Sequence, residues 1–265
     1  MDELFKAIIL GIVEGLTEFL PVSSTGHMIL TAHLLDFKGE RAATFEIVVQ
    51  LGAVLAVLIL YFKRFLGFLS LKPGITERSG INLIHLIVAM LPAIVVGLAL
   101  HRFIKAYLFG PTTVLIGLIL GGVLLIVADK VNKTMTSETM DDITYKQAFG
   151  IGLFQCLALW PGFSRSGSTM SGGILLGVSQ KAAAEFTFII SVPMMFAASG
   201  LDLYKSRDFL TSADLPVFLV GLAVSFVVAM FAIVTFLRVV KKLKLSYFAY
   251  YRFALAGVFF FILYV

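Results

Sequence analysis

Residues 215–237 read LPVFLVGLAVSFVVAMFAIVTFL, a run of 23 residues without one charged side chain. A helix of this length is long enough to cross the roughly 30 Å hydrocarbon core of a bilayer. The whole chain of 265 residues is 59% hydrophobic and 14% charged, whereas soluble domains are about 45–50% apolar and about 25% charged. The sequence therefore predicts an integral membrane protein. Its net charge of +5 is attributed to basic loops at a membrane face, and no nucleic-acid partner is expected.

Six segments are long and apolar enough to span the bilayer, and two further apolar regions are interrupted. The predicted spans are residues 43–62, 83–100, 112–128, 182–201, 215–237 and 247–264. Regions 4–20 and 147–160 end at Pro21 and Pro161, and each is followed by a polar stretch and an apolar run too short to cross. Broken backbone at membrane depth requires surrounding protein or a wet cavity. We predict an all-α polytopic membrane protein with six transmembrane helices and two re-entrant helical hairpins.

The two interrupted regions resemble each other at an offset of 140–141 residues. Glu14 falls opposite Gln155, and Ser24 falls opposite Ser164. Each half has one hairpin and three spans, so the second half starts from the opposite face of the membrane, which is an inverted-topology repeat whose broken regions meet near the midplane.

This repeat predicts one membrane domain, residues 1–265, with halves 1–130 and 141–265 joined by a cytoplasmic linker, residues 131–140. One face of the membrane would carry the loops 63–82, 129–146, 179–181 and 238–246. These loops hold 12 Lys and Arg residues, against seven on the other face. An excess of basic residues marks the cytoplasmic side. Both termini and the mouth of the first hairpin are therefore expected on the outer, periplasmic side.

Glu14 and Glu18 are ionisable residues within an apolar segment and are spaced i, i+4, so they share one helix face. Two bare carboxylates this close repel, so one takes a proton or both share a cation. Hard divalent cations such as Mg²⁺ or Ca²⁺ prefer oxygen ligands of this kind. The alternative is that Glu14 is an ordinary polar residue near the water interface.

The polar stretch after Pro21 contains Ser23, Ser24, Thr25 and His27. Proline ends the preceding helix, and Ser24 or Thr25 is expected to cap the next one, whose free N–H groups favour an anion. His27 lies near hydroxyls and carboxylates in an apolar region, which favours an acid–base role. In the alternative interpretation the hydroxyls only cap a helix and the histidine only packs.

Residues 161–169 read PGFSRSGST and form the matching polar stretch of the second half. Gly162, Ser164 and Ser166 provide flexible backbone and hydroxyls, a composition that makes an anion-binding concavity where it opens a helix. Arg165 carries the guanidinium that best fits bidentate contact with phosphate. The alternative is that Arg165 pairs with a buried glutamate for structural reasons.

Residues 14–27, EGLTEFLPVSSTGH, and residues 161–167, PGFSRSG, are similar to the motifs of the bacterial undecaprenyl-diphosphate phosphatases, the bacitracin-resistance proteins. The resemblance runs essentially from end to end. It implies hydrolysis of undecaprenyl diphosphate to the monophosphate and inorganic phosphate, in the bacterial cytoplasmic (inner) membrane, to recycle the lipid carrier for peptidoglycan synthesis. It also implies a divalent cation.

Together the residues and the resemblance predict a site at the meeting of the two hairpins. The predicted catalytic residues are Glu18, Ser24, His27 and Arg165; the predicted phosphate-binding residues are Ser23, Thr25, Gly162, Ser164 and Ser166; the predicted cation ligands are Glu14 and Glu18. Ser24 is the expected nucleophile, and a metal-activated water stays open as the alternative. The isoprenoid tail is expected to stay in lipid.

Other polar residues of the apolar segments are less decisive. Glu46 and Gln50 either support the site or lie near the interface, Arg252 is expected near a span end, and Trp160 and Tyr251 fit interfacial belts. The main rival function is a lipid-phosphate flippase or anion transporter that uses the same midplane site. A structural scaffold would leave the buried ionisable residues unexplained. The preferred isoprenoid length, the existence of a homodimer and flipping of the product are not determined by the sequence.

Overall fold

The structure is a computed structural model that describes residues 3–37, 39–69, 80–108, 110–131, 134–206 and 214–264. Within these ranges the regular structure is helical, apart from one isolated bridge between Ser137 and Val178. The α-helices of these ranges are α1 (Glu3–Thr17), α2 (Ser24–Leu34), α3 (Glu40–Leu60), α4 (Phe62–Leu69), α5 (Leu83–Ala99), α6 (His101–Phe103), α7 (Pro111–Lys130), α8 (Tyr145–Gln155), α9 (Arg165–Leu175), α10 (Gln180–Ser206), α11 (Leu215–Val239) and α12 (Leu245–Tyr264).

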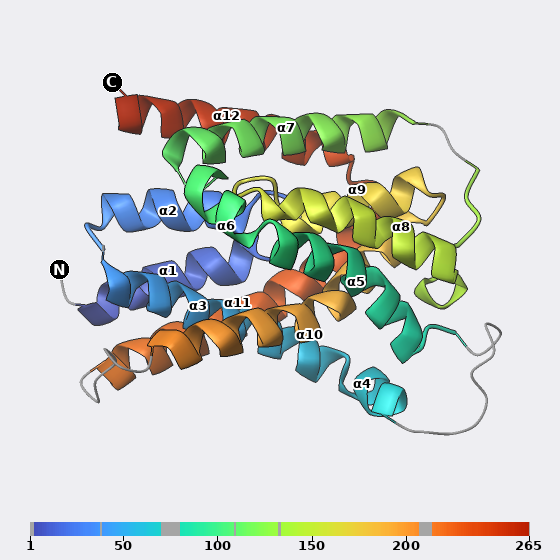
Figure 1. Ribbon diagram of the computed structural model, residues 1–265, viewed down its shortest axis with the longest axis horizontal. Helices are drawn as coiled ribbons and strands as arrows, with labels where there is room; N and C mark the ends of the chain where they lie inside the picture. Colours follow the sequence, from blue (N-terminus) through green and yellow to red (C-terminus); the bar gives the residue numbers. More distant parts are fainter. Residues whose placement is uncertain are drawn as a thin grey trace.

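The long helices lie side by side along the longest axis of the molecule, so the connections gather at its two ends (Figure 1). Helix α1 begins and helix α12 ends at the same end (Figure 1). Among the described residues, four helices are long and apolar enough to cross a membrane, and their apolar stretches are Pro111–Lys130, Gln180–Gly200, Leu215–Lys242 and Leu245–Tyr264. The described part of the chain is therefore all-helical as predicted, and its several long apolar helices are compatible with a polytopic membrane protein.

The two remaining predicted spans differ from the expectation in detail. Helix α3 ends at Leu60, and the chain then bends by 79° into α4, so this segment passes as a span only when the bent pair is taken together. Helix α5 is apolar but has 17 residues. The sequence signalled neither α4 nor α6, which both lie in segments expected to be loops.

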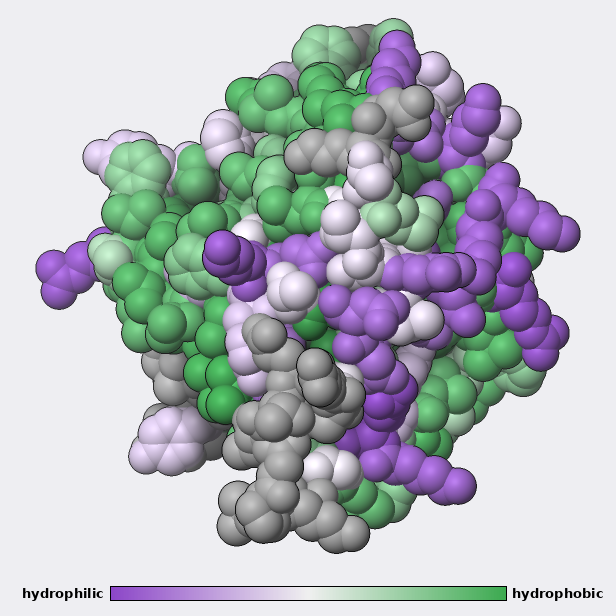
Figure 2. Space-filling view, turned by 90° about the vertical axis from the view of Figure 1, so that its right-hand side faces the viewer, coloured by the Kyte–Doolittle hydropathy of each residue, from purple (hydrophilic) through white to green (hydrophobic). Residues whose placement is uncertain are grey.

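The sides of the helix bundle carry large apolar side chains that face outward. Leu98 is 75% exposed, and Phe231 is 72% exposed. Surfaces of this kind are unfavourable in water and suit a lipid environment. Figure 2 looks at the end of the molecule that lies on the right in Figure 1, and hydrophilic side chains gather across it while hydrophobic ones form much of its outline. The polar end and the apolar sides fit a protein that crosses a bilayer along its long axis.

Part of the basic-residue count cannot be placed on this surface. Five of the counted residues lie outside the described ranges: Lys38, Lys72, Arg78, Lys133 and Arg207. At the polar end, Arg64 on α4 donates two hydrogen bonds to Asp141 of the segment between α7 and α8. The same segment contacts the α9–α10 turn through the Ser137–Val178 bridge.

Two helix–break–helix hairpins enter the bundle from opposite ends, α1–α2 from one end and α8–α9 from the other (Figure 1). In each hairpin the second helix starts at a serine with positive φ, Ser23 at 70° and Ser164 at 77°. Each serine hydroxyl accepts a hydrogen bond from the backbone N–H three residues on, at Gly26 and Gly167. Left-handed conformations are uncommon for residues with a side chain and often mark functional sites.

This cap geometry corrects two details of the sequence analysis. The cap of α2 is Ser23 rather than Ser24 or Thr25. By its cap position Ser23 matches Ser164, so Ser24 matches Arg165 at a constant offset of 141 residues. Ser23, Ser24 and Thr25 are adjacent, and serine and threonine both favour a cap. The sequence therefore does not say which hydroxyl accepts the hydrogen bond.

Packing fixes where the breaks meet. Helix α1 packs on α11, and α9 packs between α7 and α10. The ring of Phe19, just after α1, meets the ring of Phe188 on α10 edge to face at a centroid distance of 5.1 Å. Both rings belong to the largest cluster of buried apolar residues, so the first break rests on the middle of the bundle.

Candidate active site

The first break places a carboxylate and a hydroxyl in contact. Glu18 lies in the turn that follows α1, and Ser24 is the first residue of α2. Their side chains are buried, and the Ser24 hydroxyl donates a hydrogen bond of 2.5 Å to Oε2 of Glu18. Because the partner of the hydroxyl is a carboxylate, the serine proton already points at a base.

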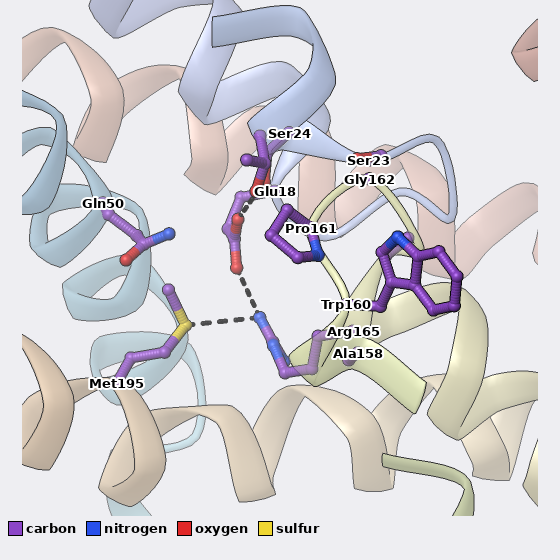
Figure 3. A pocket seen from close by; sticks show the side chains of 12 residues that line it. Glu18, Ser23, Ser24, Gln50, Ala158, Trp160, Pro161, Gly162, Arg165 and Met195 are labelled. Carbon is purple, nitrogen blue, oxygen red and sulfur yellow. Dashed lines mark hydrogen bonds and ion pairs between the residues drawn. The ribbon is translucent and has the colours of Figure 1, made fainter. Parts of the chain in front are cut away.

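The second break supplies the positive charge to the same carboxylate. Arg165 is the first residue of α9, and its Nη2 lies 2.5 Å from Oε1 of Glu18 (Figure 3). Helix α10 holds the guanidinium at both terminal nitrogens, because Nη1 donates to the Thr187 carbonyl at 3.3 Å and Nη2 also lies 3.3 Å from the Met195 sulfur. The hydroxyl, carboxylate and guanidinium therefore form one chain of contacts across the two hairpins.

A cavity of about 190 Å³ opens beside this chain of contacts. It is smaller than the roughly 300–1,000 Å³ sites of drug-sized ligands, so it suits a polar head group better than a long apolar chain. Side chains of both breaks converge on it, together with Gln50 of α3 and Met195 of α10 (Figure 3). The cavity therefore lies between the two halves of the chain.

Seven of the ten predicted site residues line this cavity: Glu18, Ser23, Ser24, Thr25, Gly162, Ser164 and Arg165. Gly162 has φ of 88°, and a Cβ there would collide with the carbonyl of Val114 on α7. Only glycine combines this backbone angle with so close an approach. The loop before α9 is therefore pressed against α7 while its Ser164 and Arg165 face the cavity.

The other three predicted residues, Glu14, His27 and Ser166, are not among those that line the cavity. Ser166 lies behind the second break, where its hydroxyl donates to the Leu20 carbonyl at 2.8 Å and lies 3.1 Å from the Ser164 hydroxyl. It therefore joins the two breaks to each other.

The His27 imidazole contacts α12 and its own helix start. Its Nε2 lies 2.6 Å from the Tyr251 hydroxyl, and its Nδ1 lies 2.8 Å from the Ser23 carbonyl. A carbonyl can only accept, so Nδ1 carries a proton, and in the neutral ring Nε2 accepts from the tyrosine. In this arrangement both ring nitrogens have partners, and neither partner is Ser24 or Glu18.

Glu14 lies one helical turn before Glu18 and is 2% exposed. Its Oε1 has no hydrogen-bond partner, an arrangement that is costly unless a proton or a cation satisfies the group. In the described ranges no group of three or more His, Cys, Asp or Glu residues is placed to hold a metal ion. A cation held by Glu14 and Glu18 would therefore need further ligands, and Mg²⁺ is commonly bound by one or two carboxylates together with substrate phosphates.

Three contacts were missed by the sequence analysis. Trp160, expected in an interfacial belt, lines the cavity, and its indole N–H donates to the Thr113 carbonyl at 2.9 Å. Tyr251, expected in the same kind of belt, contacts His27. Arg252, expected near a span end, is the eighth residue of α12 and is fully buried. An arginine inside an apolar span is itself a signal of function, and this signal was underweighted.

Known proteins are similar to this chain over nearly its whole length. The family model for the bacitracin resistance protein BacA matches residues 7–258. Undecaprenyl-diphosphatase 1 of Bacillus anthracis is 55% identical over 259 residues, which is 98% of both chains. Undecaprenyl-diphosphatase 1 of Bacillus thuringiensis subsp. konkukian (strain 97-27) is 54% identical over the same share of both chains. The chain therefore belongs to the bacitracin resistance protein BacA family.

Proposed function

We propose that this protein is a membrane phosphatase that hydrolyses undecaprenyl diphosphate to undecaprenyl phosphate and inorganic phosphate. The family and the relatives named undecaprenyl-diphosphatase support the reaction and the lipid substrate. The observation that carries the chemistry is the chain Ser24–Glu18–Arg165, with two contacts of 2.5 Å across the two breaks beside one polar cavity. Its product is the lipid carrier of cell-wall synthesis, ready for another cycle.

In the proposed mechanism Ser24 attacks the terminal phosphorus. Its proton passes to Glu18 along their hydrogen bond, and the bond from that phosphorus to the bridging oxygen breaks, which releases undecaprenyl phosphate. Water then hydrolyses the phosphoserine and returns the free hydroxyl of Ser24 with inorganic phosphate. Phosphoryl transfer depends mainly on positioning and on neutralising charge, which the residues of the second break supply.

Arg165 is suited to hold the phosphate while keeping its present partner. A guanidinium has five N–H donors, and the pair with Glu18 uses one nitrogen. The start of α9 adds backbone N–H groups, which favour an anion at a helix N-terminus. Ser23, Thr25, Gly162 and Ser164 complete the polar wall around the head group. His27 acts in this proposal by fixing the Ser23 backbone rather than by taking the serine proton.

Glu14 and Glu18 would hold a divalent cation, Mg²⁺ or Ca²⁺, together with phosphate oxygens of the substrate. Such a cation would neutralise diphosphate charge during transfer. The unpartnered Oε1 of Glu14 supports this role. Because Arg165 and Ser24 already occupy both oxygens of Glu18, Glu14 would be the main protein ligand.

We further propose the topology that delivers the lipid to this site. Six crossings, α3, α5, α7, α10, α11 and α12, surround two re-entrant hairpins, and residues 1–130 and 141–265 form an inverted repeat with a cytoplasmic linker at 131–140. The opposite entry of the hairpins and the shared end of α1 and α12 support this arrangement (Figure 1). The basic, polar end lies in the cytoplasm of a bacterial inner membrane, so the mouth of the first hairpin opens outward.

Phosphate release by the purified protein tests the function. Detergent-solubilised protein with undecaprenyl diphosphate or farnesyl diphosphate is expected to release one inorganic phosphate per molecule, and a chelator is expected to stop release until Mg²⁺ or Ca²⁺ is returned. Absence of release, together with lipid movement in vesicles, would favour the flippase or transporter. Continued release in chelator would remove the cation from the proposal.

The nucleophile needs its own experiment. Ser24→Ala is expected to abolish turnover, and Ser24→Cys is expected to form a slowly hydrolysed phospho-enzyme that acid quenching traps on residue 24. Retention of turnover in Ser24→Ala with no trapped adduct would assign the attack to a metal-activated water instead.

A further inference from the structure

Arg252 is a buried cation that the proposed mechanism does not use. It is 0% exposed on α12, and no ion pair among the described residues includes it. A buried charge is costly unless hydrogen bonds or an opposite charge compensate it. Its partners are therefore informative about why the chain keeps an arginine here.

Three backbone carbonyls receive the hydrogen bonds of Arg252. Nε donates to Leu118 at 3.0 Å, and Nη2 donates to Gly117 at 3.0 Å and to Gly162 at 2.8 Å. The first two carbonyls belong to α7, whereas Gly162 belongs to the loop that opens α9. The guanidinium therefore fastens the phosphate-facing loop to a long helix of the bundle.

The neighbouring backbone is shaped around this guanidinium. A Cβ at Gly121 would overlap Nη2 of Arg252, and a Cβ at Gly167 would lie 3.3 Å from Nη1. Nη1 itself has no hydrogen-bond partner. A cationic N–H thus lies beside the first turn of α9, the turn that begins with Arg165, and adds positive charge behind the part of the cavity that would receive phosphate.

The preceding residue, Tyr251, makes the corresponding contact with the first break. Its hydroxyl lies 2.6 Å from Nε2 of His27, and the two rings are stacked with 8° between their planes. The other ring nitrogen of His27 holds the carbonyl of Ser23. Ser23 has φ of 70° and directly precedes Ser24, so this contact acts on the backbone that aims the nucleophile.

We propose that Tyr251 and Arg252 are positioning residues, through which α12 aligns the Ser24 break and the Arg165 break on one phosphate. Tyr251 holds the first break through the side chain of His27, and Arg252 holds the second break through the backbone carbonyl of Gly162. Displacement by about 1 Å can lower a rate about 100-fold, so alignment of this kind affects turnover more than affinity. The inference rests on the proposed phosphatase reaction.

Tyr251→Phe is the decisive variant, because it removes one oxygen and leaves the ring. We expect kcat for farnesyl diphosphate to fall about tenfold while KM changes little, because Ser24 is mis-aimed but the phosphate wall stays intact. Tyr250→Phe is the matched control, since Tyr250 is the neighbouring tyrosine on the same helix and is likewise exposed. Equal kcat in the two variants would overturn the Tyr251 half of the proposal.

A double-mutant cycle shows whether Tyr251 acts through His27. In a His27→Ala background, Tyr251→Phe is expected to cause no further loss of kcat, because the relay is already broken. Losses of kcat that multiply would mean that the tyrosine acts independently of His27, against the proposal.

Phosphate release by the unsubstituted protein distinguishes failure of the proposed function from failure of the positioning role. If the unsubstituted protein is inactive, the proposed function fails. If it is active but the Tyr251 variants do not show the expected losses, the positioning role fails.

Arg252→Lys tests the second contact, since a lysine keeps the charge but cannot reach three carbonyls with one fixed fork. We expect a kcat loss of about tenfold or more with a rise in KM, because the loop that binds phosphate loosens. Its thermal unfolding midpoint in detergent is measured alongside. A folded variant with full activity would overturn the Arg252 half, and if the variant does not fold, the Tyr251 cycle decides whether α12 positions the site.

Discussion

The α1–α2 hairpin and the α8–α9 hairpin share one backbone plan. Each enters from its own end of the bundle, breaks, and restarts at a serine with positive φ that caps the next helix. Their side chains differ. The first hairpin carries Glu14, Glu18 and Ser24, whereas the second carries Arg165 and has Gln155 at the position that matches Glu14. The two hairpins therefore share a backbone plan, while the carboxylates lie on the first hairpin and the guanidinium lies on the second.

This difference explains why neither hairpin is a site by itself. The carboxylate of one hairpin needs the guanidinium of the other in a buried site, where an isolated charge is costly. The 2.5 Å contact between Glu18 and Arg165 joins them. A diphosphate substrate would meet the Arg165 guanidinium and the Ser24 hydroxyl together only where both breaks converge. Variants that make one hairpin resemble the other therefore test the site.

The largest effect is expected from Glu18→Gln. The amide keeps the shape of the side chain but cannot take the Ser24 proton, so kcat should fall about 10²–10⁴-fold. Steady-state phosphate release measures it. Glu185→Gln is the matched control, because Glu185 pairs with Lys181 outside the cavity. A Glu18→Gln enzyme within tenfold of the unsubstituted protein would remove the general-base role.

Arg165→Lys should follow, with a loss of about 10²–10³-fold in kcat/KM. A lysine keeps the charge but loses the planar fork, and its single nitrogen cannot hold Glu18, the Thr187 carbonyl and a phosphate together. The split between KM and kcat reports whether binding or transfer suffers. Arg64→Lys at the polar end is the control. Equal loss in both variants would point to a general effect of the substitution instead of a role at phosphate.

A smaller and more selective effect is expected from Glu14→Gln, which gives the first hairpin the amide that the second has at Gln155. The contact of Ser24 with Glu18 remains, but the carboxylate proposed as the main cation ligand is lost. We expect the Mg²⁺ concentration for half-maximal activity to rise about tenfold or more, with partial recovery at saturating metal. An unchanged metal requirement would place the cation elsewhere or exclude it from the reaction.

Local sequence patterns predicted the apolar helices and the two breaks of this comparison. Long apolar runs predicted the crossings, and Pro21 and Pro161 predicted the breaks. The i, i+4 spacing of Glu14 and Glu18 predicted that the two side chains lie one helical turn apart, and the anion site expected around Arg165 stays a prediction. These signals depend on a few neighbouring residues, so they can be read without knowing which helices pack together.

The remainder depends on contacts between segments that are distant in the chain. The partner of His27 is Tyr251, 224 residues away, so no local pattern shows that the imidazole turns from the cavity toward α12. Arg252 had a local signal, its charge inside an apolar span, but the meaning of that signal needed the carbonyls of α7 and of Gly162. The choice of Ser23 over Ser24 as cap depended on one backbone angle that both serines permit.

Ser166→Ala should have the smallest effect, and it separates a structural role from phosphate binding. The hydroxyl donates to the Leu20 carbonyl and joins the two breaks behind the cavity. Loss of one buried hydrogen bond costs about 1 kcal/mol, so the unfolding midpoint in detergent should fall by about 2–4 °C. Ser199→Ala on α10 provides the same substitution at a residue that does not line the cavity. A rise in KM with no change in the unfolding midpoint would instead assign Ser166 to the phosphate site predicted from the sequence. Loss of a group that touches substrate lowers substrate affinity but need not lower the stability of the fold.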